Sequence, residues 1–594
     1  MKKYILPLFF LPLGGLFLTS CNDWFEEAPI NKLSEPVIWT DPQLLDEYIM
    51  PWYREMDSGF DTYVTTIMKG LGREYEPWFA DQLTVSRSDW YTADYGNILK
   101  SSQQDITQRA KTQWSTYYTQ IRSINNLLEH LDDIPDGSQK QRITGEAHFF
   151  RAYYYYCLLR NFGAPLLITR TFDPLLEDSI TFPRASFEET VQFIADEAEK
   201  AATYLDKTNT TENIGRPTQG TALTLAGKAW FWASGAHFQN VADSVPWLGF
   251  PNDRSEEMLK KAETEYDKVR RLNVYDLMPI GGTSRDEIVK GYRQIFLTKN
   301  SVESIFEVQH ADDGDYSYKN GHLLDRYAAA PSFGGTYCAY VPTHNHVNEY
   351  CMMNGKRIDE PGSGYDAQHP YDGRDYRFYA NILYDSATWN GHVMDIHYTI
   401  DDNGKEVAGA DLTKYGSSTT ACVTKTGYYM AKFLNEKQNI DYDETYASSQ
   451  NCIIWRWAEI LLDYAEIYYK TQRPDLAKDM LNEIRRRVHM PEYESVTWDD
   501  IMNERRVEMA FEKTTYWDLL RYGTAEKIMT GKTHPLYGIK IVMQRDGTRS
   551  YNTKVVNGQN TNTRYFRTRQ YFKPIAWDDV RYHGIQQNPE WIEM

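Results

Sequence analysis

Apolar residues recur at three- and four-residue spacing along much of the chain, which is typical of amphipathic helices that bury one face. After Trp114 the apolar positions are Tyr117, Ile121, Ile124, Leu128 and Leu131. Turn residues at 135–137 end this pattern, and Gly163 ends the next one. The pattern predicts helices over about 41–56, 114–131, 138–162, 218–235, 255–272, 452–471, 474–488 and 497–523, and a further helix that begins after Ser186.

Two of these helices begin with a capping box, in which a hydroxyl side chain and an acid three residues later each bond the other's backbone. Ser186 with Glu189 forms one box, and Thr497 with Asp500 forms the other. Paired helices with short breaks are typical of tetratricopeptide-type solenoids. We therefore predict a mostly α fold with a tetratricopeptide-like scaffold of helix pairs, although no clean repeat motif is present.

The pattern changes between residues 296 and 450, where Gly, Asn, Asp and Tyr replace long periodic runs. The pairs Asn354-Gly355 and Asn403-Gly404 predict turns, and Asp546-Gly547 and Asn557-Gly558 predict hairpins near the C-terminus. These features divide the chain into an N-terminal helical region (41–295), a loop-rich, partly β insertion (296–450) and a C-terminal helical region (451–594).

The first twenty residues have the features of a signal peptide. Lys2 and Lys3 precede an apolar run over residues 4–18, and Leu18-Thr19-Ser20-Cys21 closes it. This ending resembles a bacterial lipobox, which implies that Cys21 becomes the acylated first residue of a lipid-anchored protein. Residues 21–40 would then be the membrane tether. The alternative is that Cys21 lies by chance near an ordinary cleavage site.

Composition narrows the classes of function. Mean hydropathy of −0.62 excludes a multi-span membrane protein. A formal net charge of −19 disfavours nucleic acid as a partner, because affinity for phosphate backbones comes mainly from Lys and Arg. The remaining cysteines have no C-x-x-C spacing and predict neither a disulfide scaffold nor a zinc site; they are Cys157, Cys338, Cys351, Cys422 and Cys452.

Several motifs that could carry chemistry have simpler interpretations. Residues 215–220 have the glycine spacing of a phosphate loop, but Thr221 replaces the required lysine. His344 and His346 lack the i, i+4 spacing of a hydrolase metal site. Calcium held by acidic side chains of residues 312–315 is an alternative to solvated turns, and the acids concerned are Asp312, Asp313 and Asp315. We predict no catalytic residue, no metal site and no cofactor, whereas paired carboxylates for glycoside hydrolysis remain an open alternative.

Charged residues of the C-terminal helices predict structural ion pairs. Glu459, Asp463 and Glu466 share one helical face by their spacing. Arginines on the following helices are natural partners for these acids; they are Arg485, Arg486, Arg505 and Arg506. Because charges on packed helices must be paired or solvated, we interpret these groups as struts between helices rather than as acid-base catalysts.

Aromatic residues make up 14% of the chain, which is enough to supply ring platforms at the surface as well as a core. A sugar ring stacks on flat apolar groups that are bordered by amides, carboxylates or guanidinium groups. Residues 78–97 offer this mixture in Trp78, Asp81, Arg87, Trp90, Tyr91, Tyr95 and Asn97.

A second candidate segment lies in the loop-rich insertion. Its aromatic residues are Tyr316, Tyr318, Tyr327, Phe333, Tyr337 and Tyr340, of which Tyr318, Phe333 and Tyr337 are predicted to contact the ligand. The alternative is that half or more of the aromatics in both segments pack the loops against the scaffold.

Motifs spread over nearly the whole length resemble those of the SusD/RagB family. Residues 145–155 are similar to the family's GEARFLRAYYY helix, and residues 504–512 to its ERRxELAFE helix. Further similar stretches lie at 160–166, 215–218, 303–307, 457–466, 482–487, 518–521 and 587–589, and at 372–374 with glycine in place of the family's proline.

The resemblance implies a non-catalytic lipoprotein of the Bacteroidetes outer membrane, facing the cell exterior and taking part in nutrient uptake. It implies capture of an oligo- or polysaccharide and its delivery to a SusC-like TonB-dependent transporter. It also implies four tetratricopeptide-like helix pairs and ligand contacts from the two aromatic segments. Two alternatives remain open: a surface glycoside hydrolase, and a RagB-like subunit that caps the transporter and handles peptides.

Overall fold

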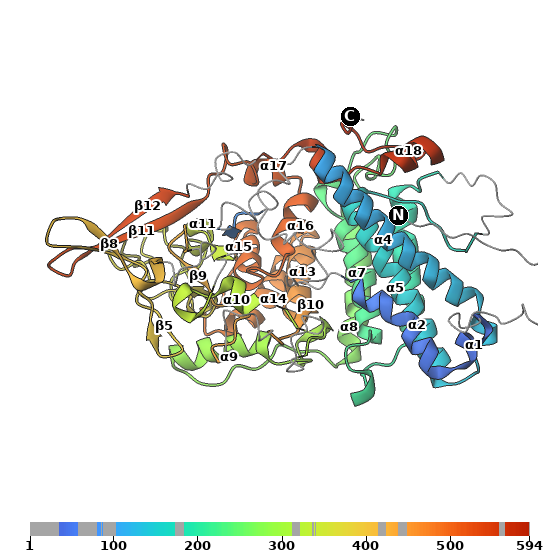
Figure 1. Cartoon of the computed structure of the whole chain (residues 1–594), viewed down its shortest axis with the longest axis horizontal. Coiled ribbons are helices and arrows are strands. Elements are labelled where there is room, and N and C mark those ends of the chain that lie inside the picture. Colours follow the sequence, from blue (N-terminus) through green and yellow to red (C-terminus); the bar gives the residue numbers. More distant parts are fainter. Residues whose placement is uncertain are drawn as a thin grey trace, which may run out of the picture.

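The computed structural model describes residues 35–56, 80–84, 86, 103–172, 183–311, 321–322, 324–335, 338, 340–413, 423–437, 448–556 and 565–592. Helices fill one half of the molecule, and short strands and loops fill most of the other (Figure 1). The mostly α fold with a loop-rich, partly β insertion is therefore confirmed. Among the described residues, none of the helices is both long and apolar enough to cross a membrane.

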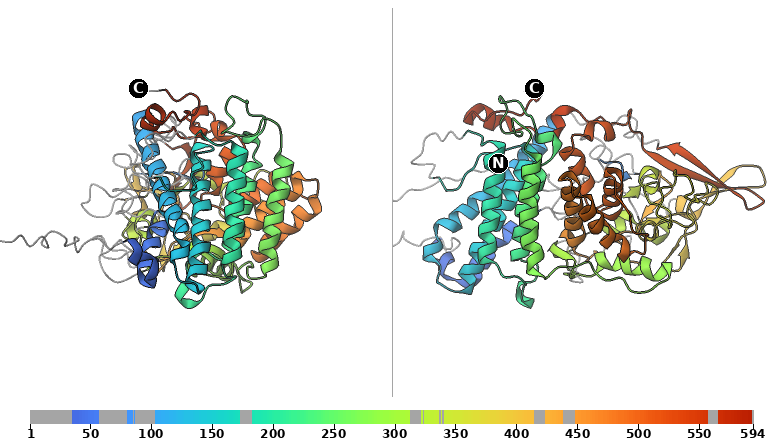
Figure 2. Two further views of the ribbon diagram at one scale, coloured as in Figure 1. Left: turned by 90° about the vertical axis from the view of Figure 1, so that its right-hand side faces the viewer. Right: turned by 180° about the vertical axis from the view of Figure 1, so that it is seen from behind.

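The helical half is a row of long helices that lie side by side (Figure 2, left). In chain order they are α1 (Glu35–Thr40), α2 (Pro42–Arg54), α4 (Gln103–Glu129), α5 (Ser138–Phe162), α6 (Phe187–Tyr204), α7 (Gln219–Ala233) and α8 (Ser255–Leu272). Asp41 caps α2 as its position before Pro42 indicates, and the predicted Ser186 capping box begins α6. α1 lies within residues 21–40, the range predicted to be the tether. Its Trp39 stacks on His130, so this end of the range packs on the helical half.

Close approach between α7 and α8 depends on a glycine. A Cβ atom on Gly227 would lie 2.3 Å from the ring of Tyr266, so any larger residue would push the two helices apart. The Ala- and Gly-rich sequence of α7 suits this contact, and the helix is buried from Gly220 to Ala233.

Helices return near the C-terminus as α13 (Trp457–Lys470), α14 (Pro474–Arg487), α15 (Trp498–Glu508), α16 (Thr514–Arg521), α17 (Ala525–Ile528) and α18 (Trp577–His583). The prediction of a helix from residue 452 is wrong at its start, because β10 (Cys452–Arg456) pairs antiparallel with β2 (Ser304–Val308). Ile453, Ile454 and Trp455 favour a strand once a partner edge is available.

The helix predicted over 497–523 is broken in two. Phe511 and Lys513 have φ angles of 67° and 72°, in the left-handed region that ends a helix. The break places Glu512 where it accepts hydrogen bonds from Lys432 and Arg456, at 2.6 and 2.7 Å. The spacing of apolar residues alone does not reveal this break in the helix. The capping box at Thr497 and Asp500 is confirmed.

The loop-rich half contains short helices and small sheets. Its helices are α9 (Arg285–Leu297), α10 (Leu324–Ala328), α11 (His344–Val347) and α12 (Tyr376–Asn381). Its two-stranded ladders join β1 (Leu83–Thr84) to β3 (Val341–Pro342), β4 (Ile382–Leu383) to β9 (Tyr429–Met430), and β5 (Thr388–Trp389) to β6 (His392–Val393).

A four-stranded sheet extends from this half, in the order β12-β11-β7-β8 (Figure 1). Its strands are β7 (Tyr398–Ile400), β8 (Glu406–Ala408), β11 (Tyr537–Met543) and β12 (Arg549–Val555). The predicted turns at Asn403-Gly404 and Asp546-Gly547 connect β7 to β8 and β11 to β12, with positive φ at both glycines. The pair Asn557-Gly558 lies outside the described residues.

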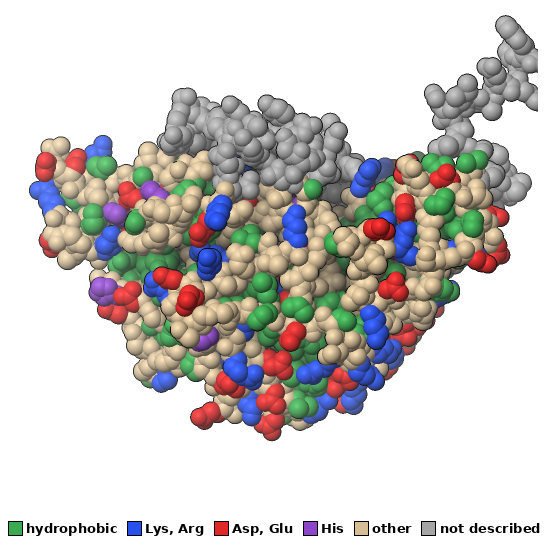
Figure 3. Space-filling view, turned by 90° about the horizontal axis from the view of Figure 1, so that it is seen from below, with side chains coloured by type: hydrophobic (Ala, Val, Ile, Leu, Met, Phe, Trp, Pro, Cys, Tyr) green, Lys and Arg blue, Asp and Glu red, His purple; other side chains and the backbone are tan. Residues whose placement is uncertain are grey.

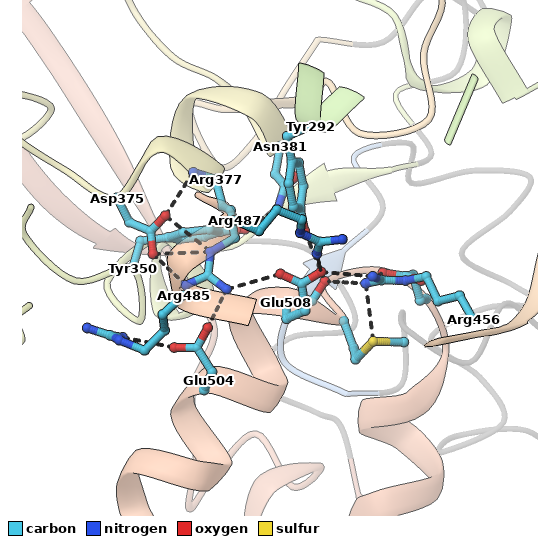
Figure 4. Close-up of polar contacts among 12 residues, drawn as sticks. Tyr292, Tyr350, Asp375, Arg377, Asn381, Arg456, Arg485, Arg487, Glu504 and Glu508 are labelled. Carbon is cyan, nitrogen blue, oxygen red and sulfur yellow. Dashed lines mark hydrogen bonds and ion pairs between the residues drawn. The ribbon is translucent and has the colours of Figure 1, made fainter. Parts of the chain in front are cut away.

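Buried ion pairs join the two halves (Figure 4). Glu508 of α15 accepts hydrogen bonds from Arg377 of α12, Arg456 of β10 and Arg487 of α14, at 3.1, 2.8 and 2.5 Å. Glu303 accepts from Arg456 and Arg487 as well. Burial raises the pKa of Glu508, but the surrounding guanidinium groups outweigh burial and hold this pKa well below its usual range.

The predicted ion-pair struts are confirmed, with partly different partners. Asp463 of α13 contacts Arg505 at 2.7 Å, as expected, and also Lys228 of α7 at 2.6 Å. Glu459 pairs with Lys228, and Glu466 with Arg521. Of the other predicted partners, Arg485 binds Glu504, Arg486 pairs with Glu492 at the surface, and Arg506 binds Asp81 and Glu349.

We expect Glu508→Gln to destabilise the fold strongly, because three buried guanidinium groups lose one of the carboxylates that neutralise them. Breaking a buried ion pair costs about 3–5 kcal/mol, so the midpoint of urea denaturation should fall. Glu492→Gln is the matched control, since both members of its pair with Arg486 are about half exposed and exposed pairs contribute little. Equal midpoints for the two variants would contradict this role of Glu508.

Acid should weaken the contact between α5 and α6. Glu197 accepts hydrogen bonds from His148 and Arg151 at 2.8 and 2.7 Å. Burial raises its pKa, but these two side chains outweigh burial and lower it from 4.5 to about 2. A depressed pKa contributes stability that is fully present above about pH 4.5 and is lost as the pH falls toward 2. In thermal melts, the difference between wild type and Glu197→Gln should shrink over this window, and a constant difference would refute the assignment.

Candidate functional site

The two segments predicted to hold the ligand meet at one place in the fold. β1 follows Asp81, and its residues Leu83 and Thr84 pair with Pro342 and Val341 of β3. The backbone N–H of Ser86 donates to the carbonyl of Cys338 at 3.0 Å, which extends the contact beyond the ladder. The described residues 80–84 and 86 of the first segment therefore lie beside residues 338 and 340–342 at the end of the second.

Asp81 fixes this attachment to the scaffold. It is 4% exposed and accepts hydrogen bonds from Arg506 of α15 at 2.7 Å and from His534 at 2.9 Å. Burial raises the pKa of Asp81, but Arg506 and His534 outweigh burial and hold the pKa well below its usual range. The carboxylate is thus ionised and already bound to protein groups, and its contact with a ligand stays a prediction.

Neighbouring polar groups hold the same anchor. Gln82 donates to the carbonyl of Arg506 at 3.1 Å, and Thr343 donates both its hydroxyl and its backbone N–H to the 81–82 backbone. The backbone N–H of Lys425 donates to the Ser86 hydroxyl at 2.8 Å, so the 423–437 stretch also contacts the anchor.

The two histidines of α11 have separate partners. His344 Nδ1 lies 2.9 Å from the hydroxyl of Tyr428, whereas His346 lies between Glu349 at 2.6 Å and Tyr350 at 3.1 Å. Burial, and secondarily Arg374, lowers the pKa of His344 to about 4. These contacts explain both side chains without a metal ion.

Most of the predicted ligand-binding residues lie outside the described residues. These are Trp78, Arg87, Trp90, Tyr91, Tyr95, Asn97, Tyr318 and Tyr337, together with the predicted lipidation site Cys21 and the candidate calcium ligands Asp312, Asp313 and Asp315. Phe333 is described, and its half-buried ring makes an edge-to-face contact with His392 at 5.3 Å. Tyr327 and Tyr340 are buried in the core, where they pack the loops as the alternative interpretation expects.

The motif at residues 215–220 is structural. Arg216 pairs with Glu146 and Asp46, and Thr218 forms the capping box of α7. Gly215 lies in the loop before α7 with a positive φ, whereas Gly220 lies in the first turn of α7, where a Cβ atom would meet the ring of Tyr275 at 2.4 Å.

A groove that the sequence did not reveal offers a similar mixture of groups. It has a volume of about 770 Å³ and lies between α9 and the β4–β5 region. Tyr379 and Tyr384 line it beside Arg285, Arg293 and Asn435. These residues come from three separate stretches of the chain, so no local motif could have identified the groove.

On the face shown in Figure 3, acidic and basic side chains lie among one another rather than in separate patches. Such a surface provides no concentrated field of one sign to select a charged partner.

Comparison with known proteins gives consistent results. Residues 302–591 match a family model described as the SusD family, and residues 32–239 match one described as "Starch-binding associating with outer membrane". A SusD-like protein of Bacteroides ovatus is 22% identical over 522 residues, covering 86% of this chain and 81% of that protein. SusD-like protein P38 of Formosa agariphila is 21% identical over 550 residues, covering 89% and 94%.

Solved structures show the same fold. A crystal structure of a SusD-like protein from Bacteroides fragilis has a TM-score of 0.71 at 23% identity, covering 95% of this chain and all of that one. Surface glycan-binding protein A from Bacteroides thetaiotaomicron, in complex with laminarihexaose, has a TM-score of 0.57 at 16% identity, covering 92% and 99%.

Replacing Arg506 with Gln should loosen the anchor, because Asp81 and Glu349 lose their shared cation. We expect amide exchange in residues 80–84 and 340–343 to become at least about tenfold faster, as measured by hydrogen-exchange mass spectrometry. Arg486→Gln, which removes a surface guanidinium, is the control and should leave exchange there unchanged. Unchanged protection in Arg506→Gln would show that the β1–β3 ladder does not depend on this ion pair.

Proposed function

The chain belongs to the SusD family, and from this membership we propose that it is a non-catalytic glycan-binding lipoprotein of the cell surface. It captures an oligo- or polysaccharide and delivers it to a SusC-like TonB-dependent transporter in the outer membrane. The family description that names starch binding and the outer membrane supports this proposal. The fold shared with a protein solved in complex with laminarihexaose supports it as well.

The observation that carries the proposal is the shared anchor of the two aromatic segments. Because β1 and β3 are paired, the described residues 80–84 of the first aromatic segment lie beside residues 340–342, at the end of the second. A sugar chain needs several ring faces with polar groups at their edges. Two aromatic segments with a common origin supply such a surface without requiring a deep pocket.

The charged groups of the scaffold favour binding over catalysis. The carboxylates predicted to be struts, Glu459, Asp463 and Glu466, accept hydrogen bonds from Lys228, Arg505 and Arg521. A general acid for glycoside cleavage needs access to the glycosidic oxygen as well as a raised pKa. Burial does raise the pKa of Glu459, whereas at Asp463 and Glu466 the neighbouring cations outweigh burial and lower the pKa. These acids are buried between helices and contact cations, so they hold helices together.

Delivery requires the protein to stay at the membrane without crossing it. A lipid-modified Cys21 at the end of the signal sequence provides that attachment. The transporter partner follows from the family, and residues 21–34 would connect the lipid to the first helix. Shallow stacking sites bind modestly, so we expect a dissociation constant of about 1 μM or weaker, about −8 kcal/mol.

We expect wild type to bind at least one glycan in a polysaccharide panel, as measured by affinity electrophoresis and calorimetry. Trp78→Ala and Trp90→Ala should each weaken that binding at least about tenfold, because a lost stacking platform removes about 1.4 kcal/mol or more. Tyr582→Ala is the control, since Tyr582 is a 75% exposed ring on α18, outside both segments.

An assay for reaction products, run with the same glycans, distinguishes the proposal from its alternatives. Binding without new reducing ends supports capture, and appearance of reducing ends would show a glycoside hydrolase instead. Peptide binding with no affinity for any glycan would identify a RagB-like subunit. Unchanged glycan affinity in both tryptophan variants would refute the position of the site.

A further inference from the structure

We propose that Asp385, Asp395 and His397 form a binding site for one divalent transition-metal ion, with zinc as the expected ion. The site lies in the loop-rich half, apart from the anchor of the aromatic segments. Asp385 follows β4, whereas Asp395 and His397 lie in the connection between β6 and β7. Metal binding by these three residues does not depend on glycan binding.

The three side chains bring one donor atom each to a common point. His397 Nδ1 is 2.8 Å from Asp385 Oδ1, with which it shares a hydrogen bond, and 3.2 Å from Asp395 Oδ1. One ligand atom from each of the three side chains lies within 4.8 Å of the other two. Zinc binds nitrogen and carboxylate oxygen at about 2.0–2.2 Å in tetrahedral geometry, which places neighbouring ligand atoms roughly 3.3 Å apart. The two separations from His397 are thus within about 0.5 Å of the value that the ion requires, and the hydrogen bond between His397 and Asp385 would give way to the ion, with the imidazole proton carried on Nε2.

One of these oxygens accepts no hydrogen bond from the part of the chain that the structure describes. Asp395 Oδ1 is shielded from solvent, although its side chain as a whole is 38% exposed, and His397 Nδ1, 3.2 Å away, is not aligned to donate to it. Its partner oxygen accepts from the Ala410 N–H at 2.9 Å, so the carboxylate is held in place. Leaving a buried carboxylate oxygen unsatisfied is costly, and a cation removes that cost.

A glycine makes room for this arrangement. A Cβ atom on Gly409 would lie 2.0 Å from Asp395 Oδ1, so only glycine lets the backbone pass this close to the carboxylate. The 409–410 backbone thus closes one side of the site and shields Oδ1 from water.

The surrounding groups favour a cation. Arg549 Nε lies 3.1 Å from Asp385 Oδ2, on the side away from His397, and supplies one positive charge. Asp411 adds a third carboxylate; it accepts from the Asp395 N–H at 2.8 Å and contacts His392 at 3.1 Å. Three carboxylates and one guanidinium leave a net negative charge at the site before either histidine is counted.

The donor set selects the class of ion. An imidazole nitrogen with two carboxylates suits zinc and its transition-metal neighbours, whereas calcium takes six to eight oxygens. The Ile396 N–H donates to Asp385 Oδ1 at 3.0 Å and orients the first ligand. Outer contacts of this kind hold metal ligands in place. A bound ion would fasten the turn after β4 to the β6–β7 connection, next to the four-stranded sheet.

The test uses the full chain after removal of metals with EDTA. Calorimetric titration with zinc chloride should show one equivalent bound, with a dissociation constant on the order of 1 μM or below. Cobalt chloride should give the visible absorption of a tetrahedral site with a nitrogen ligand. Asp395→Asn and His397→Gln should each weaken zinc binding at least about tenfold.

His369→Gln is the matched control, because His369 and Asp372 form an exposed pair 3.9 Å apart. It should leave zinc affinity unchanged. Asp395→Asn keeps an oxygen that can accept from Ala410, so it reports on the site even if His397→Gln lowers the folded fraction. The proposal would be overturned if wild type showed no saturable zinc binding, or if both site variants bound zinc as tightly as wild type. It would also be overturned if His369→Gln lost as much affinity as the site variants, or if equimolar calcium displaced zinc.

Discussion

Pairing of buried charges is the constraint on which the rest of this structure depends. Glu508 lies where α12, β10 and α14 converge, and each of these elements contributes one guanidinium group to it. A buried ion left without its partner costs several kcal/mol, so the elements cannot shift independently. Arg377 comes from the loop-rich half and Arg456 from the edge of the helical half, so the same carboxylate holds both halves in one arrangement.

α15 distributes this constraint through the molecule, because its consecutive charged side chains point in different directions. Glu504 contacts Arg377 and Arg485, Arg505 contacts Asp463 and Asp518, and Arg506 reaches Asp81 and Glu349. The helix that stabilises the core therefore also holds the base of the aromatic segments. Ligand recognition in the proposed function needs rings in fixed relative positions, and a rigid base meets that need without a preformed pocket.

The loop-rich half is built differently, from short ladders and local polar contacts rather than long helices. Asp411 alone binds the backbone of Asp395 and the side chains of Ser332 and His392, and so connects η5 (Pro331–Phe333) to the β6–β7 connection. Phe333 lies on this short helix and touches the ring of His392. The carboxylates that organise these loops are thus close both to one predicted ligand contact and to the inferred metal site.

The sequence by itself determined the helical class, the two capping boxes, the turn at Gly404, the hairpin at Gly547, and the family, because periodicity, caps and turns depend on residues a few positions apart. It also indicated that the acids of α13 would pair with arginines of the following helices, as Asp463 does with Arg505. Only the tertiary structure decided that residues 452–456 form a strand, that α15 ends before Phe511, and that Arg506 binds Asp81. Each of these depends on a partner that is remote in sequence, such as the edge of β2 or a carboxylate 425 residues away. Local spacing cannot specify such a partner, since burial and charge neutralisation select it only when the chain is folded.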